Sequence, residues 1–317
     1  MLCRCLKVTR SGFYAWRRRP ESAHTQVDRR LRVVVRAAFE RSRRRYGSPR
    51  IHRDLREDDV RVSRKRVVRL MREEGLQARP RKRFKMTTDS NHTDPVAPNV
   101  LARAFTAAAP NQRWVGDTTE LLVGPSRAKL YLAVLLDLFS RFIVGWALSA
   151  VNDRHLVIKA LRMAIQRRCP DAGLLHHSDR GCTYASEDYQ TVLEANRITC
   201  SMSRRGDCYD NAAMESLFST VKTELGEHFD GYSDAKKQMF DYIELFYNPQ
   251  RRHSTLDYVS PAMYERGHRA AAEIVPASRG AARRQPDPGD VSSNDRRLAA
   301  LTLSDDQKGT TTEGMTA

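Results

Sequence analysis

The sequence of 317 residues lacks the cysteine and histidine patterns of a zinc-binding module. Its six cysteines include no C-x-x-C pair, and no two histidines lie at zinc-finger spacing. Six cysteines without such spacing are typical of reduced thiols in an intracellular protein. The sequence therefore excludes a zinc finger and gives no sign of a disulfide framework.

Long apolar runs are also missing. The longest one, LYLAVLLDLF, is interrupted by Asp137 and is too short to span a bilayer. No charged segment followed by an apolar segment begins the chain. We expect a soluble, cytoplasmic protein that has no membrane partner.

Positive charge is what the sequence has in excess, and all of the excess lies in the first third. Residues 1–100 contain 28 Lys and Arg against 11 Asp and Glu, whereas the remaining residues contain 27 of each kind. This asymmetry indicates a polyanion-binding module joined to a near-neutral domain. We expect the polyanion to be double-stranded DNA, because no strongly apolar helix face for a membrane surface accompanies the charge.

The basic third divides into three predicted parts. Residues 1–45 are predicted to be a basic helical segment, and residues 46–80 a helix-turn-helix-like DNA-binding module. Residues 81–110 have the composition of a linker. In the second helix of the module, Ser63 is a suitable N-cap and Gly75 a suitable end. The side chains predicted to face DNA are Arg64, Lys65, Arg66 and Arg69; the alternative is a helical bundle with a solvated basic face.

The segment 111–268 is predicted to be a mixed α/β domain. Three apolar-rich runs with short turns, at 112–123, 128–139 and 142–149, indicate an antiparallel meander. Helical and strand-like periods then alternate to about residue 248. The resulting order predicts a mixed sheet with helices packed on it. Residues 269–317 are polar and rich in Pro and Gly, which predicts disorder.

Three carboxylates could meet in this domain. Asp117 lies within the first apolar strand, where a carboxylate must be paired, protonated or bound to a cation. Asp179 ends the fourth strand. Glu215 lies on a helix, and Lys222 follows on the same side within about 20°. If the first and fourth strands are neighbours, the three acids converge and suit Mg²⁺ or Mn²⁺.

Other polar residues have structural interpretations. Asp137 could pair with Arg141 beside the turn, and Asp210 or Asn211 could cap the Glu215 helix. His176 and His177 precede Asp179 and could either hydrogen-bond a carboxylate or pack. Arg251 and Arg252 belong to a basic loop suited to DNA phosphates.

Several motifs in a fixed order carry a resemblance to a known family. They include YGSPRI, WVGDTTEL, YLAVLLDLFSRFIVGWALS, HHSDRGCTY, SMSRRGDCYDNAAMESLFSTVKTEL and FYNPQRRHSTLDYVSPAMYE. With the 35 residues between Asp179 and Glu215, the chain resembles the integrase-core transposases of bacterial insertion sequences, in particular the downstream-frame product of two-frame elements. One departure is Asp257, where the resemblance leads us to expect glycine.

The resemblance implies an RNase H-like core with a mixed five-stranded sheet and a triad of Asp117, Asp179 and Glu215. It implies DNA cleavage and strand transfer with two divalent ions. It also implies an upstream-frame partner or frameshift fusion and a homo-oligomer on DNA. The alternatives are a DNA-binding regulator or a non-catalytic remnant, an RNase H-type hydrolase, and a retroviral integrase, which would carry an N-terminal zinc module.

Overall fold

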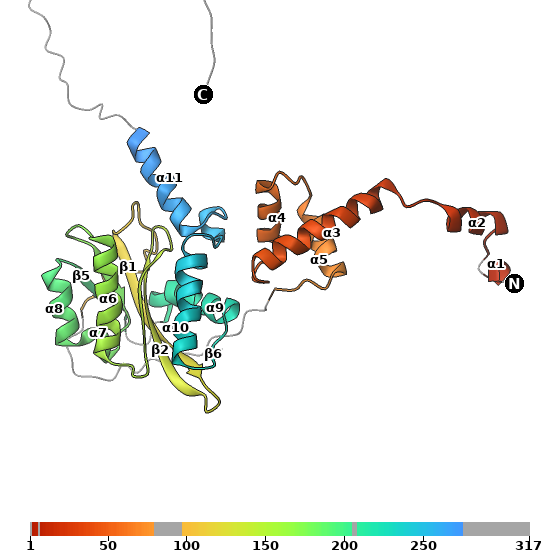
Figure 1. Ribbon diagram of the computed structural model, residues 1–317. Coiled ribbons are helices and arrows are strands. Elements are labelled where there is room, and N and C mark those ends of the chain that lie inside the picture. Colours follow the sequence, from red (N-terminus) through yellow and green to blue (C-terminus); the bar gives the residue numbers. More distant parts are fainter. Residues whose placement is uncertain (1, 6, 79–96, 205–207, 275–317) are drawn as a thin grey trace, which may run out of the picture. The chain divides into compact units, whose positions relative to one another are not determined.

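The structure is a computed structural model that describes residues 2–5, 7–78, 97–204 and 208–274 (Figure 1). Most of the predicted linker and of the predicted disordered tail lies outside these residues. The last helix, α11 (Pro261–Ile274), nevertheless continues through residues 269–274, which were predicted to be disordered. No helix in the described ranges has the length and apolar character needed to cross a membrane.

Helices make up the basic N-terminal third. They are α1 (Leu2–Cys5), α2 (Arg10–Arg18), α3 (Ala23–Arg41), α4 (Ser48–Glu57) and α5 (Arg64–Glu73). Helix α5 begins where the sequence predicts, because the Ser63 hydroxyl accepts a hydrogen bond from the backbone N–H of Arg66. Its predicted stripe of Val67, Leu70 and Met71 is buried.

Helices α3, α4 and α5 pack together around one apolar core. Leu31 and Val35 of α3 are buried in the same cluster as Ile51 and Leu55 of α4. Helix α3 therefore belongs with the helix-turn-helix pair, although its sequence lies within the predicted segment 1–45. Helix α2 has no buried residue.

A mixed sheet forms the centre of the second half. Its strands are β1 (Arg113–Val123), β2 (Ala128–Asp137), β3 (Ile143–Ser149), β4 (Leu175–Ser178), β5 (Thr199–Met202) and the short β6 (His228–Phe229). Strands β1, β2 and β3 form the predicted antiparallel meander. Strands β4 and β5 continue the sheet in parallel with β1, and β6 pairs with the other end of β1. The order β3-β2-β1-β4-β5 confirms that the first and fourth strands are neighbours.

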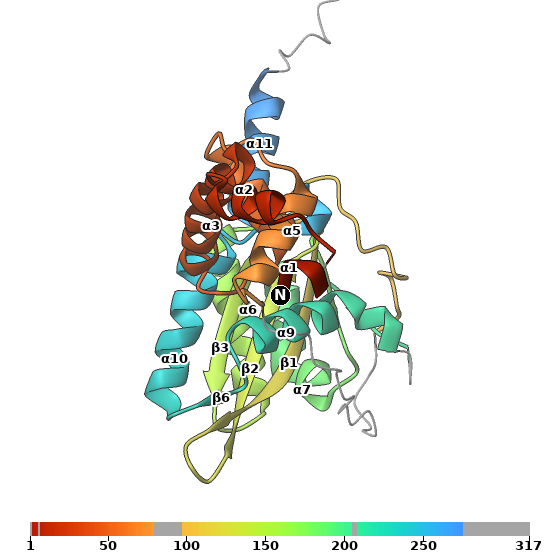
Figure 2. The ribbon, with the colours of Figure 1, turned by 90° about the vertical axis from the view of Figure 1, so that its right-hand side faces the viewer.

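Helices cover both faces of this sheet (Figure 1). On one face lie α6 (Arg154–Arg168), α7 (Cys182–Ala185) and α8 (Glu187–Ala195). On the other lie α9 (Ala212–Glu224), α10 (Tyr232–Phe240) and the π-helical η2 (Asp241–Tyr247). Two short 3₁₀ turns, η1 (Cys208–Asn211) and η3 (Ser254–Leu256), complete this half. Figure 2 shows α9 lying across β1.

The second half of the predicted linker is part of the core. Leu101 is buried, and the Ser201 hydroxyl accepts hydrogen bonds from the backbone N–H groups of Val100 and Leu101. Residues 97–110 have the composition of a linker. The hydrogen-bond partner that fixes Val100 and Leu101 lies about 100 residues away in the chain, so the local sequence does not reveal that this segment belongs to the core.

Candidate active site

Asp117 lies on β1, in the middle of the sheet, and its carboxylate is held from two sides. The backbone N–H of Thr118 donates to Oδ1 at 2.7 Å, and the Asn211 amide donates to Oδ2 at 2.8 Å. Asn211 comes from η1, immediately before α9. The carboxylate is therefore oriented by its own strand and by the chain that leads into the Glu215 helix.

Asp179 follows β4 directly, and the strand register brings it level with Asp117. Val115 pairs with His177 in the parallel β1–β4 ladder, and Asp117 and Asp179 each lie two residues further on. The backbone N–H of Gly181 donates to Asp179 Oδ1 at 2.9 Å. A Cβ at Gly181 would lie 3.0 Å from that oxygen, so glycine allows the chain to turn close to the carboxylate.

Glu215 lies in the first turn of α9 and is half-buried. The predicted apolar stripe of Met214, Leu217, Phe218 and Val221 is buried against the sheet, which places Glu215 at the border of that stripe. Burial raises the pKa of Glu215. Glu215 thus adds a third carboxylate, on the helix that packs against β1.

The electrostatics of Asp117 involve both of the other acids. Burial, and after it the negative charge of Asp179, raise the pKa of Asp117 well above its ordinary value, and the charge of Glu215 adds to the effect. Like charges gathered in a buried site disfavour joint ionisation unless a cation is present. Of the two neighbouring charges, that of Asp179 raises the pKa of Asp117 more than that of Glu215 does.

The three carboxylates are not arranged around a single metal position. No group of three or more His, Cys, Asp and Glu side chains within the described ranges is arranged to hold a metal ion. The chemistry of the donors nevertheless fits a hard divalent cation, because they are carboxylate oxygens, and the pKa values of Asp117 and Glu215 are raised. In addition, Asn211 Oδ1 is buried beside Asp117 without a hydrogen-bond partner among the described residues.

The two histidines before Asp179 make hydrogen bonds elsewhere. His176 Nε2 pairs with the Tyr189 hydroxyl at 2.8 Å, and His177 pairs with the hydroxyls of Ser201 and Ser203. Burial lowers the pKa of His176 to about 3, so its imidazole is neutral at physiological pH. Of the two interpretations of these histidines, the contacts favour packing.

Asp210 and Asp137 serve the structure around the site. Asp210 accepts hydrogen bonds from Asn99, Arg103 and Arg204 and so ties segment 97–106 to the chain before α9. Asp137 is fully buried, and the cation beside it is Arg168, at 3.8 Å. The predicted Asp137–Arg141 pair is absent from these contacts, since the Arg141 guanidinium donates to the Phe105 carbonyl instead.

The arginines and lysines predicted to contact DNA divide into two groups. Arg64 and Lys65 are exposed on α5, and Lys222 is half-buried on α9, where burial lowers its pKa. Four of the arginines form ion pairs within the chain: Arg66 and Arg69 with Asp28, Arg251 with Glu224, and Arg252 with Asp54 and Glu57.

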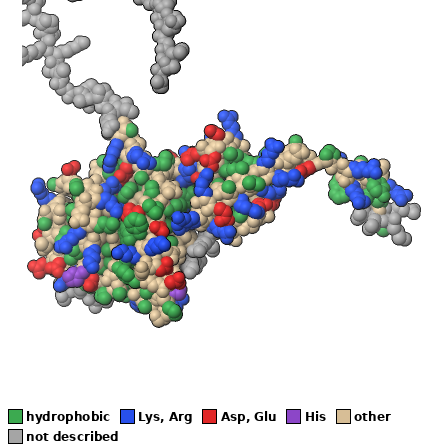
Figure 3. Space-filling model, in the orientation of Figure 1, with side chains coloured by type: hydrophobic (Ala, Val, Ile, Leu, Met, Phe, Trp, Pro, Cys, Tyr) green, Lys and Arg blue, Asp and Glu red, His purple; other side chains and the backbone are tan. Residues whose placement is uncertain are grey.

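Arg251 is only 3% exposed, so this member of the basic loop expected after residue 248 is internal. Figure 3 likewise shows many basic side chains beside acidic ones on the visible face. Sequence reasoning missed these partners because they are distant in the chain.

Two parts of the chain match family models. An integrase core domain matches residues 107–208 and again 196–261, and an HTH-like domain matches residues 26–84. The chain is 42% identical over 274 residues to the insertion element IS600 uncharacterized 31 kDa protein of Shigella sonnei, which covers 86% of this chain and 100% of that protein. It is 41% identical over 268 residues to transposase InsF for insertion sequence IS3A of Escherichia coli, with 83% and 92% covered.

The chain belongs to the IS3 family of insertion-sequence transposases. Its integrase core makes this transposase a polynucleotidyl transferase of the Asp-Asp-Glu type, and residues 26–84 match an HTH-like domain. Among solved structures, the catalytic core of HTLV-2 integrase in complex with magnesium aligns with a TM-score of 0.39 and 17% identity, covering 50% of this chain and 99% of that one.

Proposed function

We propose that this transposase cleaves DNA at the ends of its insertion sequence and joins them to a target, using Asp117, Asp179 and Glu215 as the catalytic carboxylates. The observation that carries the proposal is the parallel β1–β4 ladder, which sets buried Asp117 level with Asp179, with Glu215 on the helix that packs against β1. A buried acidic cluster of this kind has an evident use in binding Mg²⁺ or Mn²⁺.

Asp117 and Asp179 would hold the metal ions together with Glu215. A pair of such ions supplies charge neutralisation at the phosphorus and activation of a water or a 3′-hydroxyl. The chain itself sets the geometry: Asn211 and the Thr118 N–H orient Asp117, and the Gly181 N–H orients Asp179. No serine or tyrosine nucleophile is required.

The DNA would be bound by both halves of the chain. Arg64 and Lys65 offer exposed cations on α5 for the phosphate backbone, and Lys222 lies on the Glu215 helix for a phosphate near the scissile bond. An upstream-frame partner or fusion and a homo-oligomer on DNA belong to the same proposal. Its substrate, chromosomal DNA, places the reaction in the bacterial cytoplasm.

The test is a strand-transfer assay with the variant Asp117→Asn. We expect normal binding to element ends but no cleavage or joining in Mg²⁺, because the amide removes one negative charge from the cluster. Asp171→Asn, the same substitution on an exposed loop, should retain full activity. Cleavage by the Asp117→Asn variant would contradict the triad, and cleavage without joining by the unmodified chain would identify a hydrolase. A chain that binds DNA but never cleaves it would be a regulator or a remnant.

A further inference from the structure

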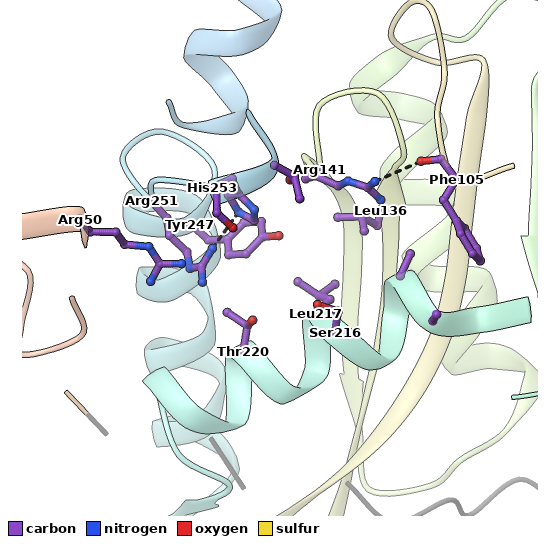
Figure 4. A pocket seen from close by; sticks show the side chains of 14 residues that line it. Arg50, Phe105, Leu136, Arg141, Ser216, Leu217, Thr220, Tyr247, Arg251 and His253 are labelled. Atoms are coloured by element: carbon purple, nitrogen blue, oxygen red, sulfur yellow. Dashed lines mark hydrogen bonds between the residues drawn. The ribbon is translucent and has the colours of Figure 1, made fainter. Parts of the chain in front are cut away.

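A pocket of about 290 Å³ lies along one side of α9 (Figure 4). Ala212, Ser216 and Thr220 recur at four-residue intervals along α9 and line one wall. Glu215 is not among the lining residues, and at about 100° per residue its side chain points along a different face of the helix. The pocket and the carboxylate cluster therefore share one helix but are separate sites.

The pocket has both apolar and cationic lining residues. Phe105, Leu136 and Leu217 provide apolar lining. Arg141 reaches the pocket from the turn after β2, and Arg251 and His253 from the chain that follows η2. Further lining comes from Arg50 of α4, and the exposed Ser254 and Thr255 lie at the mouth.

The guanidiniums outnumber the carboxylates that compensate them. Arg251 and Arg50 share a single carboxylate, that of Glu224, with Arg251 forming the closer pair at 2.7 Å. Arg141 donates to a neutral acceptor, the Phe105 carbonyl at 3.1 Å. This part of the pocket therefore has a surplus of positive charge that an anion would compensate.

His253 shows the effect of that surplus. Arg251 Nη1 lies 3.0 Å from His253 Nε2, and because arginine can only donate, Nε2 accepts and the imidazole is neutral. Burial, and after it the charges of Arg251, Arg50 and Arg141, lower the pKa of His253 well below its ordinary value. A neutral imidazole then has its remaining N–H on Nδ1, available as a donor.

We propose that this pocket binds one phosphate group of a DNA strand and so anchors that strand behind the catalytic helix. Guanidinium, imidazole and hydroxyl groups are the side chains that proteins use to contact backbone phosphates. The pocket combines three guanidiniums with the hydroxyls of Ser216, Ser254 and Thr255. The proposal rests on the DNA-joining function above and adds a second point of attachment on α9.

The experiment measures the affinity of the full-length chain for a fluorescein-labelled DNA duplex at several salt concentrations. It is done in EDTA and with Asp117→Asn, so that cleavage plays no part. One lost phosphate contact should lower the slope of log Kd against log salt by about 0.9. We expect this loss in Arg141→Gln, and unchanged slope in Arg162→Gln, an exposed position on the opposite face of the sheet.

A second pair of variants avoids the risk that Arg141→Gln disturbs folding. Ser254→Glu with Thr255→Glu adds negative charge at the exposed mouth and should weaken duplex binding at least about fivefold, whereas Ser254→Gln with Thr255→Gln should not. Equal affinities for these two double variants would overturn the proposal.

Calorimetry with inorganic phosphate separates the two sources of the same chemistry. Phosphate binding that depends on Arg141, with an unchanged DNA slope, would mean a site for free phosphate and would also overturn the proposal. All of these measurements record binding and not cleavage. A failure of the proposed catalytic triad would therefore not change their interpretation.

Discussion

Asn211 is the residue whose role differs most from its sequence-based interpretation. Its position before an apolar helix predicted an N-cap, but its side chain makes no capping hydrogen bond in α9. It donates instead to Asp117, which lies 94 residues earlier in the chain. The Asn211 amide at the start of α9 therefore orients the Asp117 carboxylate instead of capping the helix.

Replacing Asn211 with alanine should slow cleavage about 10–100-fold, the usual cost of removing a group that orients a metal-binding side chain. Calcium binding, measured by calorimetry, should weaken as well, because Asp117 loses one of its two fixed donors. Asn152→Ala, on an exposed turn, provides the control. Wild-type rates and calcium affinity in the Asn211→Ala variant would show that the hydrogen bond has no part in the site.

Asp257 departs from the family pattern, and its backbone conformation explains why aspartate is tolerated there. Glycine was expected at this position, and the structure gives Asp257 a left-handed conformation with φ of 50°. Glycine adopts this conformation at no steric cost, and aspartate is one of the few other residues that tolerate it. The departure from the family pattern therefore keeps the same turn.

At the scale of elements, strand β3 and helix α6 approach each other closely at Gly145. A Cβ built there would lie 2.2 Å from the Ala160 carbonyl oxygen and 2.8 Å from the Ala164 Cβ. The small residues on both sides let the helix lie directly on the strand. The position of α6 on the sheet thus depends on the absence of a single side chain.

Gly145→Ala should therefore destabilise the chain by about 1–3 kcal/mol, the range for overpacking a close-packed core. Gly267→Ala on α11 is the matched control, since its Cβ would meet nothing within 4 Å and alanine favours a helix. Chemical denaturation of the two variants should give shifts of opposite sign. Equal midpoints would mean that β3 and α6 can separate without cost.

At the scale of the whole molecule, net charge and available charge are different quantities. All of the excess positive charge is in residues 1–100, yet several of the arginines there are paired with acids of neighbouring helices. Asp28, buried between α3 and α5, is an example, because its hydrogen bonds with Arg69 and Arg66 hold its pKa down at about 2. Charge arithmetic therefore overstates the cations that face DNA.

The exposed pair Arg64 and Lys65 should nevertheless contribute to DNA affinity. Replacing both with glutamine removes two phosphate contacts and should lower the salt slope of duplex binding by about 2. Lys159→Gln with Arg162→Gln removes the same charge from exposed positions of α6 and should leave the slope unchanged. A slope equal to that of the control would show that α5 does not belong to the DNA-binding surface.

The sequence by itself determined the local elements and singled out three acids as candidates. Alternating and helical periods marked the β1–β3 meander, the apolar stripe of α9 and the start of α5, because these depend on neighbours within a few residues. The positions of Asp117, Asp179 and Glu215 relative to those elements followed from the same periods.

Only the tertiary structure decided which groups meet. The parallel pairing of β1 with β4 brings Asp117 level with Asp179, and η1 brings Asn211 to Asp117. The pairing of Arg251 with Glu224, and of Arg66 with Asp28, joins residues 27 and 38 positions apart. Such contacts depend on how elements pack, and a local pattern of side chains contains no information about the partner that will cover it.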